Sequence, residues 1–250
     1  AGDLGRAIPL YEATLADRER VLGADHPDTL SSRNNLAYAY ESAGDLGRAI
    51  PLYEQSLADC ERVLGANHPH TLISRNNLAY AYESAGDLGR AIPLYEATLA
   101  DRERVLGADH PDTLSSRNNL AYAYESAGDL GRAIPLCEAT LADCERILGA
   151  DHPDTLTSRN NLASAYRAVG DLGRAIPLYE ATLAARKRVL GASHVATLSS
   201  RNNLAFAYES AGDLGRAIPL YEATLADCER ILGADHHVTK AVRANLAAPR

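Results

Sequence analysis

The stretch RNNLAYAYESAGDLGRAIPLYE, residues 33–54, returns with few changes every 42 residues along this 250-residue chain. The repeat divides the chain into blocks that begin at Ala1, Ala43, Ala85, Ala127, Val169 and, for a partial sixth copy, Ala211. Blocks one and three are identical. A period in the range of roughly 20–50 residues is typical of stacked units that contact only their neighbours. The repeat therefore predicts a solenoid.

Each block contains two helical patterns, of which the longer comes first. In block one the apolar residues that recur at spacings of three, four or seven are Leu4, Ile8, Tyr11, Leu15 and Leu22. This spacing is typical of an amphipathic helix. We expect Asp3 to cap its N-terminus and Gly23 to end it.

The second pattern of block one begins at Pro27, a residue that suits the first turn of a helix. Asp28 lies near the positive end of the helix dipole. The pattern places four residues inward, namely Leu30, Leu36, Ala37 and Tyr40. Gly44 ends this helix, and Asp45 caps the longer helix of the next block.

Applied to every block, these signals predict an all-α chain of about twelve helices that forms one domain over residues 1–250. The longer helices are expected near 3–22, 45–64, 87–106, 129–148, 171–190 and 213–232. The shorter ones are expected near 27–42, 69–84, 111–126, 153–168, 195–210 and 236–247. Helix 3–22 and helix 236–247 flank five full repeats, at 27–64, 69–106, 111–148, 153–190 and 195–232. Because the chain opens inside a repeat and contains no Met, we interpret it as a fragment of a longer protein.

A proline lies inside every longer helical pattern, at Pro9, Pro51, Pro93, Pro135, Pro177 and Pro219. Proline removes one backbone donor and crowds the carbonyl four residues earlier. That earlier residue is always glycine, as at Gly5 and Gly47. One interpretation is a bend in each longer helix, for which glycine leaves room. The other is that the helix begins only near the proline.

Composition and charge exclude several classes of protein. Hydrophobic residues make up 46% of the chain, yet it has 13 Tyr, 1 Phe and no Trp, which favours thin helical layers. We find no apolar run long enough for a membrane span and no signal peptide. The net charge of -8 argues against binding to nucleic acid. Arginine supplies nearly all of the basic residues, which indicates a GC-rich bacterial gene.

Motifs for catalysis or for a cofactor are absent from the sequence. It contains no Gly-Lys-Ser/Thr phosphate loop, no His-Glu-x-x-His zinc motif and no Gly-x-Ser-x-Gly elbow. One histidine per block precedes the shorter helix. Copies in successive blocks are expected to lie roughly 10 Å apart, which is too far for them to share a metal ion. These histidines are His26, His68, His110, His152, His194 and His236. We therefore expect these histidines to cap loops, not to bind a metal. The sequence predicts no enzyme, cofactor or metal site.

The cysteines do not form a disulfide framework. Cys60, Cys144 and Cys228 occupy equivalent positions two blocks apart, roughly 20 Å from each other, which exceeds the reach of a disulfide. Cys137 replaces an inward Tyr and is expected to be a small buried residue. Free thiols fit a reducing cytoplasm.

The residues of the repeat resemble a known family. The elements Asn34-Asn35-Leu36-Ala37-Tyr38-Ala39-Tyr40, Gly44-Asp45 and Ala49-Ile50-Pro51-Leu52-Tyr53 look like the tetratricopeptide repeat, in the 42-residue form of kinesin light chains and many bacterial multidomain proteins. Arg33 stands where the common pattern has Trp, and Ala37 stands where it has Gly. The resemblance implies a right-handed αα-hairpin superhelix. It also implies that the shorter helices line a concave groove that binds a peptide or protein.

By that resemblance the groove-facing positions of block one are Ser31, Asn34, Asn35, Tyr38 and Glu41. Helical spacing agrees, since these residues fall on one side of the helix. The first asparagine of each block forms a series that we expect to clamp peptide amides: Asn34, Asn76, Asn118, Asn160 and Asn202. The second series has the same expected role, or alternatively ties one layer to the next: Asn35, Asn77, Asn119, Asn161 and Asn203.

Hydrogen bonds from asparagine do not supply enough affinity alone. Five contacts at roughly 1 kcal/mol net each give about 5 kcal/mol, whereas micromolar binding needs roughly 8 kcal/mol. The expected anchors for the remainder are large aromatic rings, at Tyr38, Tyr80, Tyr122 and Phe206. The alternative role of these rings is packing between layers.

Block four departs from the pattern on the expected groove side. It has Ser164 in place of Tyr and Arg167 in place of Glu, with Ala168 next to them. One hypothesis is a pocket at Ser164 and Arg167 that pairs with an acidic side chain of the ligand. The other is neutral drift.

Two functions from different classes remain open from the sequence. The favoured one is a non-enzymatic scaffold that binds a peptide or protein in the groove. The alternative is self-association into head-to-tail oligomers, in which Leu4, Ile8 and Tyr11 of one molecule pack on Val242 and Leu246 of another.

Overall fold

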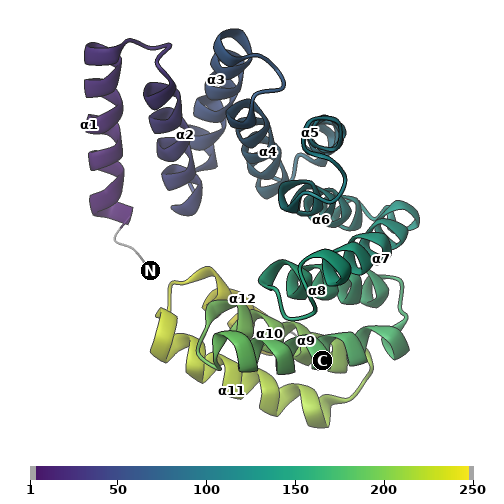
Figure 1. Cartoon of the computed structure of the whole chain (residues 1–250). Coiled ribbons are helices and arrows are strands. Elements are labelled where there is room, and N and C mark those ends of the chain that lie inside the picture. The colour runs from purple at the N-terminus through teal and green to yellow at the C-terminus, as the bar shows by residue number, and fades with distance from the viewer. Residues whose placement is uncertain (1–3, 248–250) are drawn as a thin grey trace. The chain divides into compact units, whose positions relative to one another are not determined.

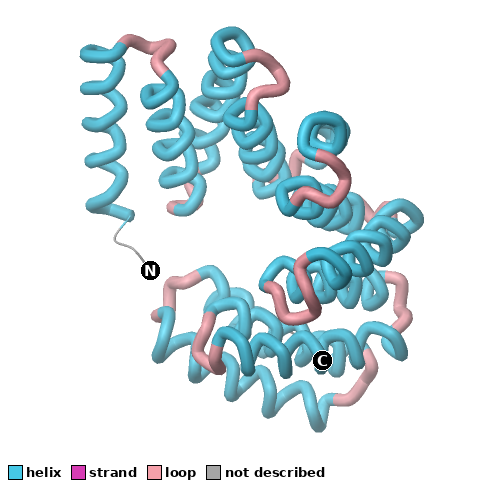
Figure 2. Tube along the Cα trace, in the orientation of Figure 1, coloured by secondary structure: helices cyan, strands magenta, loops and turns pink. Residues whose placement is uncertain are grey.

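Helices account for the regular structure of the chain in a computed structural model that describes residues 4–247 (Figure 1). The longer helices are α1 (Leu4–Leu22), α3 (Leu46–Leu64), α5 (Leu88–Leu106), α7 (Leu130–Ile147), α9 (Leu172–Leu190) and α11 (Leu214–Leu232). The shorter ones are α2 (Pro27–Ser42), α4 (Pro69–Ser84), α6 (Pro111–Ser126), α8 (Pro153–Ala168), α10 (Val195–Ser210) and α12 (His237–Ala247). Within the described residues there is no strand (Figure 2). The predicted all-α fold of successive helical hairpins is confirmed.

The chain forms two compact units, one with α1–α6 and the other with α7–α12. Inside each unit every helix packs against the next helix in sequence. The shorter helices of neighbouring blocks also contact each other, α2 with α4 in the first unit and α10 with both α8 and α12 in the second. Each unit therefore presents one face built from shorter helices, and the asparagine series lie on these helices.

The helix ends follow the capping signals of the sequence. The Asp45 Oδ1 atom accepts a hydrogen bond from the Arg48 backbone N–H at 3.1 Å, while Gly44 turns the chain with φ of +80°. At the shorter helices the Nδ1 atom of His26 accepts from the Asp28 N–H at 3.2 Å. The other five histidines of the series make the same contact. Their capping role is confirmed; the cap expected at Asp3 lies outside the described residues.

The prolines lie well inside the longer helices. Pro51, for example, follows five residues of α3, which begins at Leu46. The interpretation that the helix begins only near the proline is therefore wrong. The bend remains a prediction.

The core is thin and repeats from block to block. Leu30, Leu36, Ala37 and Tyr40 are buried as expected, and the longer helices contribute tyrosines such as Tyr53. The equivalent Tyr11 is 41% exposed. The hydroxyl of Tyr53 reaches Glu41 of the preceding block, and no described helix precedes α1. The inward position expected for Tyr11 is therefore wrong.

Arg33, at the position of the family tryptophan, is a buried link between three helices. Its Nη1 atom lies 2.7 Å from Asp59 Oδ2 in α3, and its Nη2 atom lies 2.9 Å from Glu19 Oε1 in α1. Arg75 makes the same pair of contacts one block later, to Asp101 at 2.6 Å and Glu61 at 3.1 Å. Paired and hydrogen-bonded guanidinium groups are thus part of the interior.

Block five lacks one carboxylate of this arrangement. Lys187 stands at the position of Glu19, so Arg201 keeps only the equivalent of Asp59, which is Asp227 at 2.6 Å. The Nε atom of Arg201 is buried without a hydrogen-bond partner among the described residues. In block five a cation therefore stands at the sequence position that supplies a carboxylate to the arginine in blocks one and two.

Lys187→Glu is expected to raise the free energy of unfolding by about 1 kcal/mol, because a hydrogen bond to a charged group replaces a repulsive neighbour. Urea unfolding followed by circular dichroism measures the change. Lys187→Gln, which removes the charge without adding a carboxylate, is expected to give less than half of the gain. Equal gains from the two variants would contradict pairing with Arg201.

Candidate peptide-binding face

The asparagines of neighbouring blocks bond to each other. The Nδ2 atom of Asn77 donates to Asn34 Oδ1 at 3.3 Å, and Asn119 donates to Asn76 at 3.1 Å. In the second unit Asn203 donates to Asn160 at 3.1 Å, and Asn245 donates to Asn202 at 3.1 Å. Asn77, Asn119 and Asn203 of the second series thus tie one layer to the next, as the alternative interpretation proposed.

This pairing uses only the oxygen atom of each paired amide in the first series. Asn34, Asn76, Asn160 and Asn202 accept through Oδ1, and within the described residues their own NH₂ groups donate to no protein atom. Their side chains are half-buried, whereas Asn118 is buried. Each unit therefore offers two fixed amides, Asn34 and Asn76 in one and Asn160 and Asn202 in the other, as hydrogen-bond donors at the surface of its shorter helices. We call this surface, with the aromatic residues next to it, the ladder face.

The aromatic residues of the ladder face are exposed. The exposed fractions are 62% for Tyr38, 51% for Tyr80, 47% for Tyr122 and 38% for Phe206. These values leave ring surface available on every one of the four side chains. Exposed aromatic surface is what an anchoring residue needs before a partner covers it.

A cavity of about 270 Å³ lies between the aromatic residues of α4 and α6. Its wall includes Tyr80, Tyr122 and Glu83, together with Ser84, Gly86, Leu88 and Ser126. Glu83 accepts a hydrogen bond from the Tyr95 hydroxyl at 2.8 Å, while its Oε1 atom is buried without a partner among the described residues. Burial raises the pKa of Glu83, and the bond from Tyr95 offsets part of this effect. The pKa of Glu41 is raised by the same cause.

Glu83→Gln is expected to raise the melting temperature by up to a few degrees near pH 7. A pKa that is higher in the folded than in the unfolded chain means that the ionised carboxylate destabilises the fold above that pKa. This cost disappears below the unfolded value of about 4.3, so the advantage of Gln is expected to vanish near pH 4. Thermal unfolding across this pH range, with the exposed Glu222→Gln as control, measures it. A gain that does not depend on pH would contradict the assignment to burial of charge.

Arg167 and Ser164 lie on α8, in the second unit. The Arg167 guanidinium stacks on the Phe206 ring, with Cζ 4.5 Å from the ring centroid. A cation over an aromatic face at this distance is attracted by the ring. The Ser164–Arg167 pocket for an acidic side chain stays a prediction, with Phe206 now added to it.

The contact surface expected for self-association is partly wrong. Val242 is completely buried within the chain and is not available to a second molecule. Leu246, Leu4 and Ile8 are half-buried. The most exposed apolar side chains of α1 are instead Leu10 and Val21.

Other kinds of site find no support in the part of the chain that the structure describes. No group of three or more His, Cys, Asp or Glu side chains there is placed to hold a metal ion. Among residues 4–247 no helix combines the length and the apolar character needed to cross a bilayer.

The fold and the ladder face define a helical-hairpin repeat protein. The chain belongs to the tetratricopeptide repeat family, whose model matches residues 1–61, 39–103, 85–136, 118–188 and 159–226. This fold is a scaffold that commonly mediates protein–protein interaction. No curated protein matches the chain.

Solved structures with the same fold include kinesin-light-chain-like proteins. A kinesin-light-chain-like protein of Podosopora anserina with nearly identical TPR-like repeats is 31% identical, with a TM-score of 0.64 over 90% of this chain and 99% of that one. A single-substitution variant of it is 34% identical, with a TM-score of 0.67 over 82% and 97%. BtubC (BKLC) from P. vanneervenii, at 22% identity and a TM-score of 0.69 over 100% and 96%, shares the fold.

Proposed function

We propose that the ladder face binds an extended peptide segment of a partner protein, without catalysis and without a cofactor. The observation that carries this proposal is the pair of half-buried asparagine NH₂ groups in each unit, each fixed through its Oδ1 atom by the neighbouring block. Fixed amide donors match the backbone carbonyls of an extended chain, whatever its side chains. The exposed aromatic residues supply the apolar contacts beside them.

The fixed geometry lowers the cost of binding. An amide that is already held by a neighbour loses less conformational freedom when a ligand arrives. Each donor still contributes only about 1 kcal/mol net, so the aromatic side chains must supply the larger share. Arg167, stacked on Phe206, adds a contact for an acidic side chain in the second unit.

Selection of peptides from a random display library against the chain tests the proposal. We expect selected peptides to bind Asn34→Ala and Asn76→Ala variants less tightly, with the reduction in the same direction for peptides of unrelated sequence. Peptides that bind these variants and the parent chain equally would contradict the use of the ladder. An Arg167→Glu variant is expected to reject only those peptides that carry an acidic residue.

Self-association is the second candidate, favoured by the exposed Leu10 and Val21 of α1. It predicts a mass that rises with concentration in sedimentation velocity, whereas the peptide-binding account predicts a constant monomer mass.

The four buried cysteines, which are free, support a reducing cytoplasm as the compartment.

A further inference from the structure

Arginine and cysteine alternate at one position of the longer helices. Successive blocks carry Arg18, Cys60, Arg102, Cys144, Arg186 and Cys228 at this position. The exchange replaces a long charged side chain by a small thiol in every second block. The blocks with arginine therefore show which hydrogen-bond acceptors surround a guanidinium group at this position.

The arginines fill an interior site made of neutral acceptors. Arg186 is buried, and its Nη1 atom donates to the Ala196 carbonyl at 3.2 Å and to Ser200 Oγ at 2.7 Å. Its Nη2 atom donates to Thr157 Oγ1, from the shorter helix of the preceding block, at 3.3 Å. Arg102 likewise donates to a carbonyl at 2.9 Å and to Ser116 Oγ at 2.8 Å. A guanidinium group is thus held here without a direct carboxylate partner.

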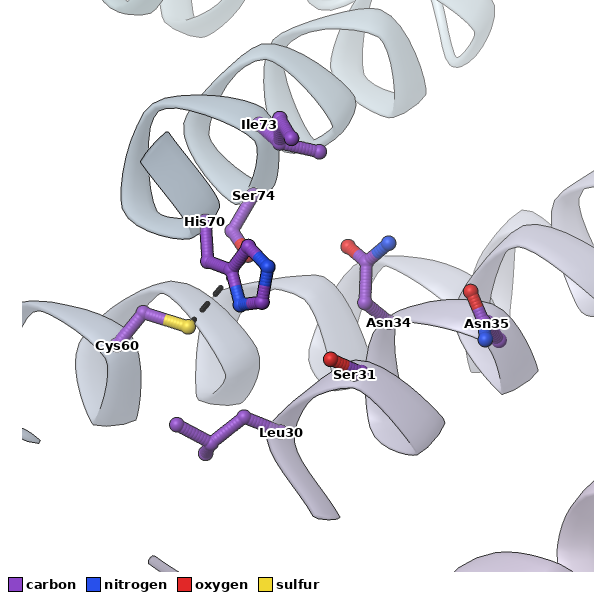
Figure 3. Close-up of a pocket in the computed structure, with 8 residues that line it drawn as sticks. All are labelled: Leu30, Ser31, Asn34, Asn35, Cys60, His70, Ile73 and Ser74. Carbon is purple, nitrogen blue, oxygen red and sulfur yellow. Dashed lines mark hydrogen bonds between the residues drawn. The ribbon is translucent and has the colours of Figure 1, made fainter. Parts of the chain in front are cut away.

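Block two has a cavity of about 180 Å³ beside Cys60. Figure 3 shows its wall, in which one helix contributes Leu30, Ser31, Asn34 and Asn35, and another contributes His70, Ile73 and Ser74. The Cys60 Sγ atom lies 3.7 Å from Ser74 Oγ. The thiol is much shorter than the arginine that stands at this position in blocks one, three and five.

The acceptors of the missing arginine remain in this cavity. Ser74 has the register of Ser200, and the His70 carbonyl has that of the Ala196 carbonyl. Ser31 has the register of Thr157, and within the described residues its hydroxyl makes no hydrogen bond. His70 and Ile73 are exposed, and Asn34 belongs to the first asparagine series. The cavity therefore borders the ladder face.

We propose that the cavity beside Cys60 binds the guanidinium group of an arginine side chain carried by the bound peptide. The role of the peptide rests on the proposed function, whereas the preference for guanidinium rests on the acceptors retained in block two. A guanidinium group carries five donors in a planar fork and can reach acceptors on both sides of a slot, whereas an ammonium is a compact point charge that is more strongly hydrated. The net charge of -8 also favours a cationic ligand.

N-acetyl-arginine amide, titrated into the ¹⁵N-labelled chain, tests the cavity without any peptide. We expect shifts of the Ser31, His70 and Ser74 amide signals, and binding at least about tenfold tighter than that of N-acetyl-lysine amide. Cys60→Arg, which copies blocks one, three and five, is expected to abolish the shifts, while Cys60→Ala keeps them. Equal binding of the lysine probe, or shifts that persist in Cys60→Arg, would overturn the proposal.

Ser74→Val provides a second variant should Cys60→Arg not fold, because the chain already carries Val242 at this register. It removes one acceptor and is expected to weaken binding of the arginine probe at least about fivefold, and unchanged binding would overturn the proposal. Failure of the arginine probe together with successful peptide selection would refute this proposal alone. Binding of the probe without any selected peptide would refute the peptide-binding function alone.

Discussion

Arg75→Ala is expected to lower the free energy of unfolding by about 3 kcal/mol, the largest change in stability that we predict for a single residue. The Arg75 guanidinium is buried and pairs with Asp101 of α5 and Glu61 of α3. Removing one member of a buried pair typically costs about 3–5 kcal/mol, because it leaves charge without compensation. Both carboxylates here keep partial access to water, which places the expected value at the lower end.

The matched control is Arg20→Ala. Arg20 also pairs with an aspartate, Asp17 at 3.1 Å, but both side chains are more than two thirds exposed. Exposed pairs contribute about 0–1 kcal/mol. Urea unfolding of both variants gives the comparison. A cost for Arg75→Ala that is no larger than that for Arg20→Ala would show that the buried arginines do not hold the layers together.

Replacement of both Tyr80 and Tyr122 by Ser is expected to weaken binding of a selected peptide by about 100-fold. Ser is the residue that the chain itself carries at this position in block four, as Ser164. The two rings flank the cavity between α4 and α6, and an aromatic anchor typically contributes about 1–3 kcal/mol when it is truncated. Isothermal titration calorimetry measures the change in affinity.

Tyr11→Ser is the control for this loss, because Tyr11 is also partly exposed, at 41%, but lies on the longer helix α1 and is not part of the wall of this cavity. We expect no change in affinity from it. The double variant is expected to keep its helical content, since both rings are exposed. A folded double variant that binds the selected peptide as tightly as the parent would contradict anchoring by these tyrosines.

Much of the fold was predictable because its signals are local. Asp45 and His26 cap helices through atoms within three residues of themselves, so the sequence around each cap suffices. Positions that depend on neighbouring layers were harder. Tyr11 has the same surrounding sequence as the buried Tyr95, since blocks one and three are identical, yet Tyr11 is 41% exposed. Val242 is buried, since α12 packs on α10 and α11.

The candidate site was predictable as a set of positions but not as a set of bonds. Helical spacing puts Asn34 and Asn35 on one side of α2, yet the bond from Asn77 to Asn34 joins residues from different blocks. Its geometry depends on how closely α2 approaches α4, and no sequence spacing gives that distance. The cavity beside Cys60 was also missed, although the alternation of Arg and Cys along the blocks was a signal for it.

The position of a bound peptide tests the central claim most directly. Tyr80 is replaced by photoreactive p-benzoylphenylalanine, a selected peptide is added, and the cross-linked product is identified by mass spectrometry after irradiation. The account predicts a cross-link to the peptide from position 80 and none from the same amino acid placed at Tyr11. A peptide that cross-links from position 11 and not from position 80 would contradict binding at the ladder face.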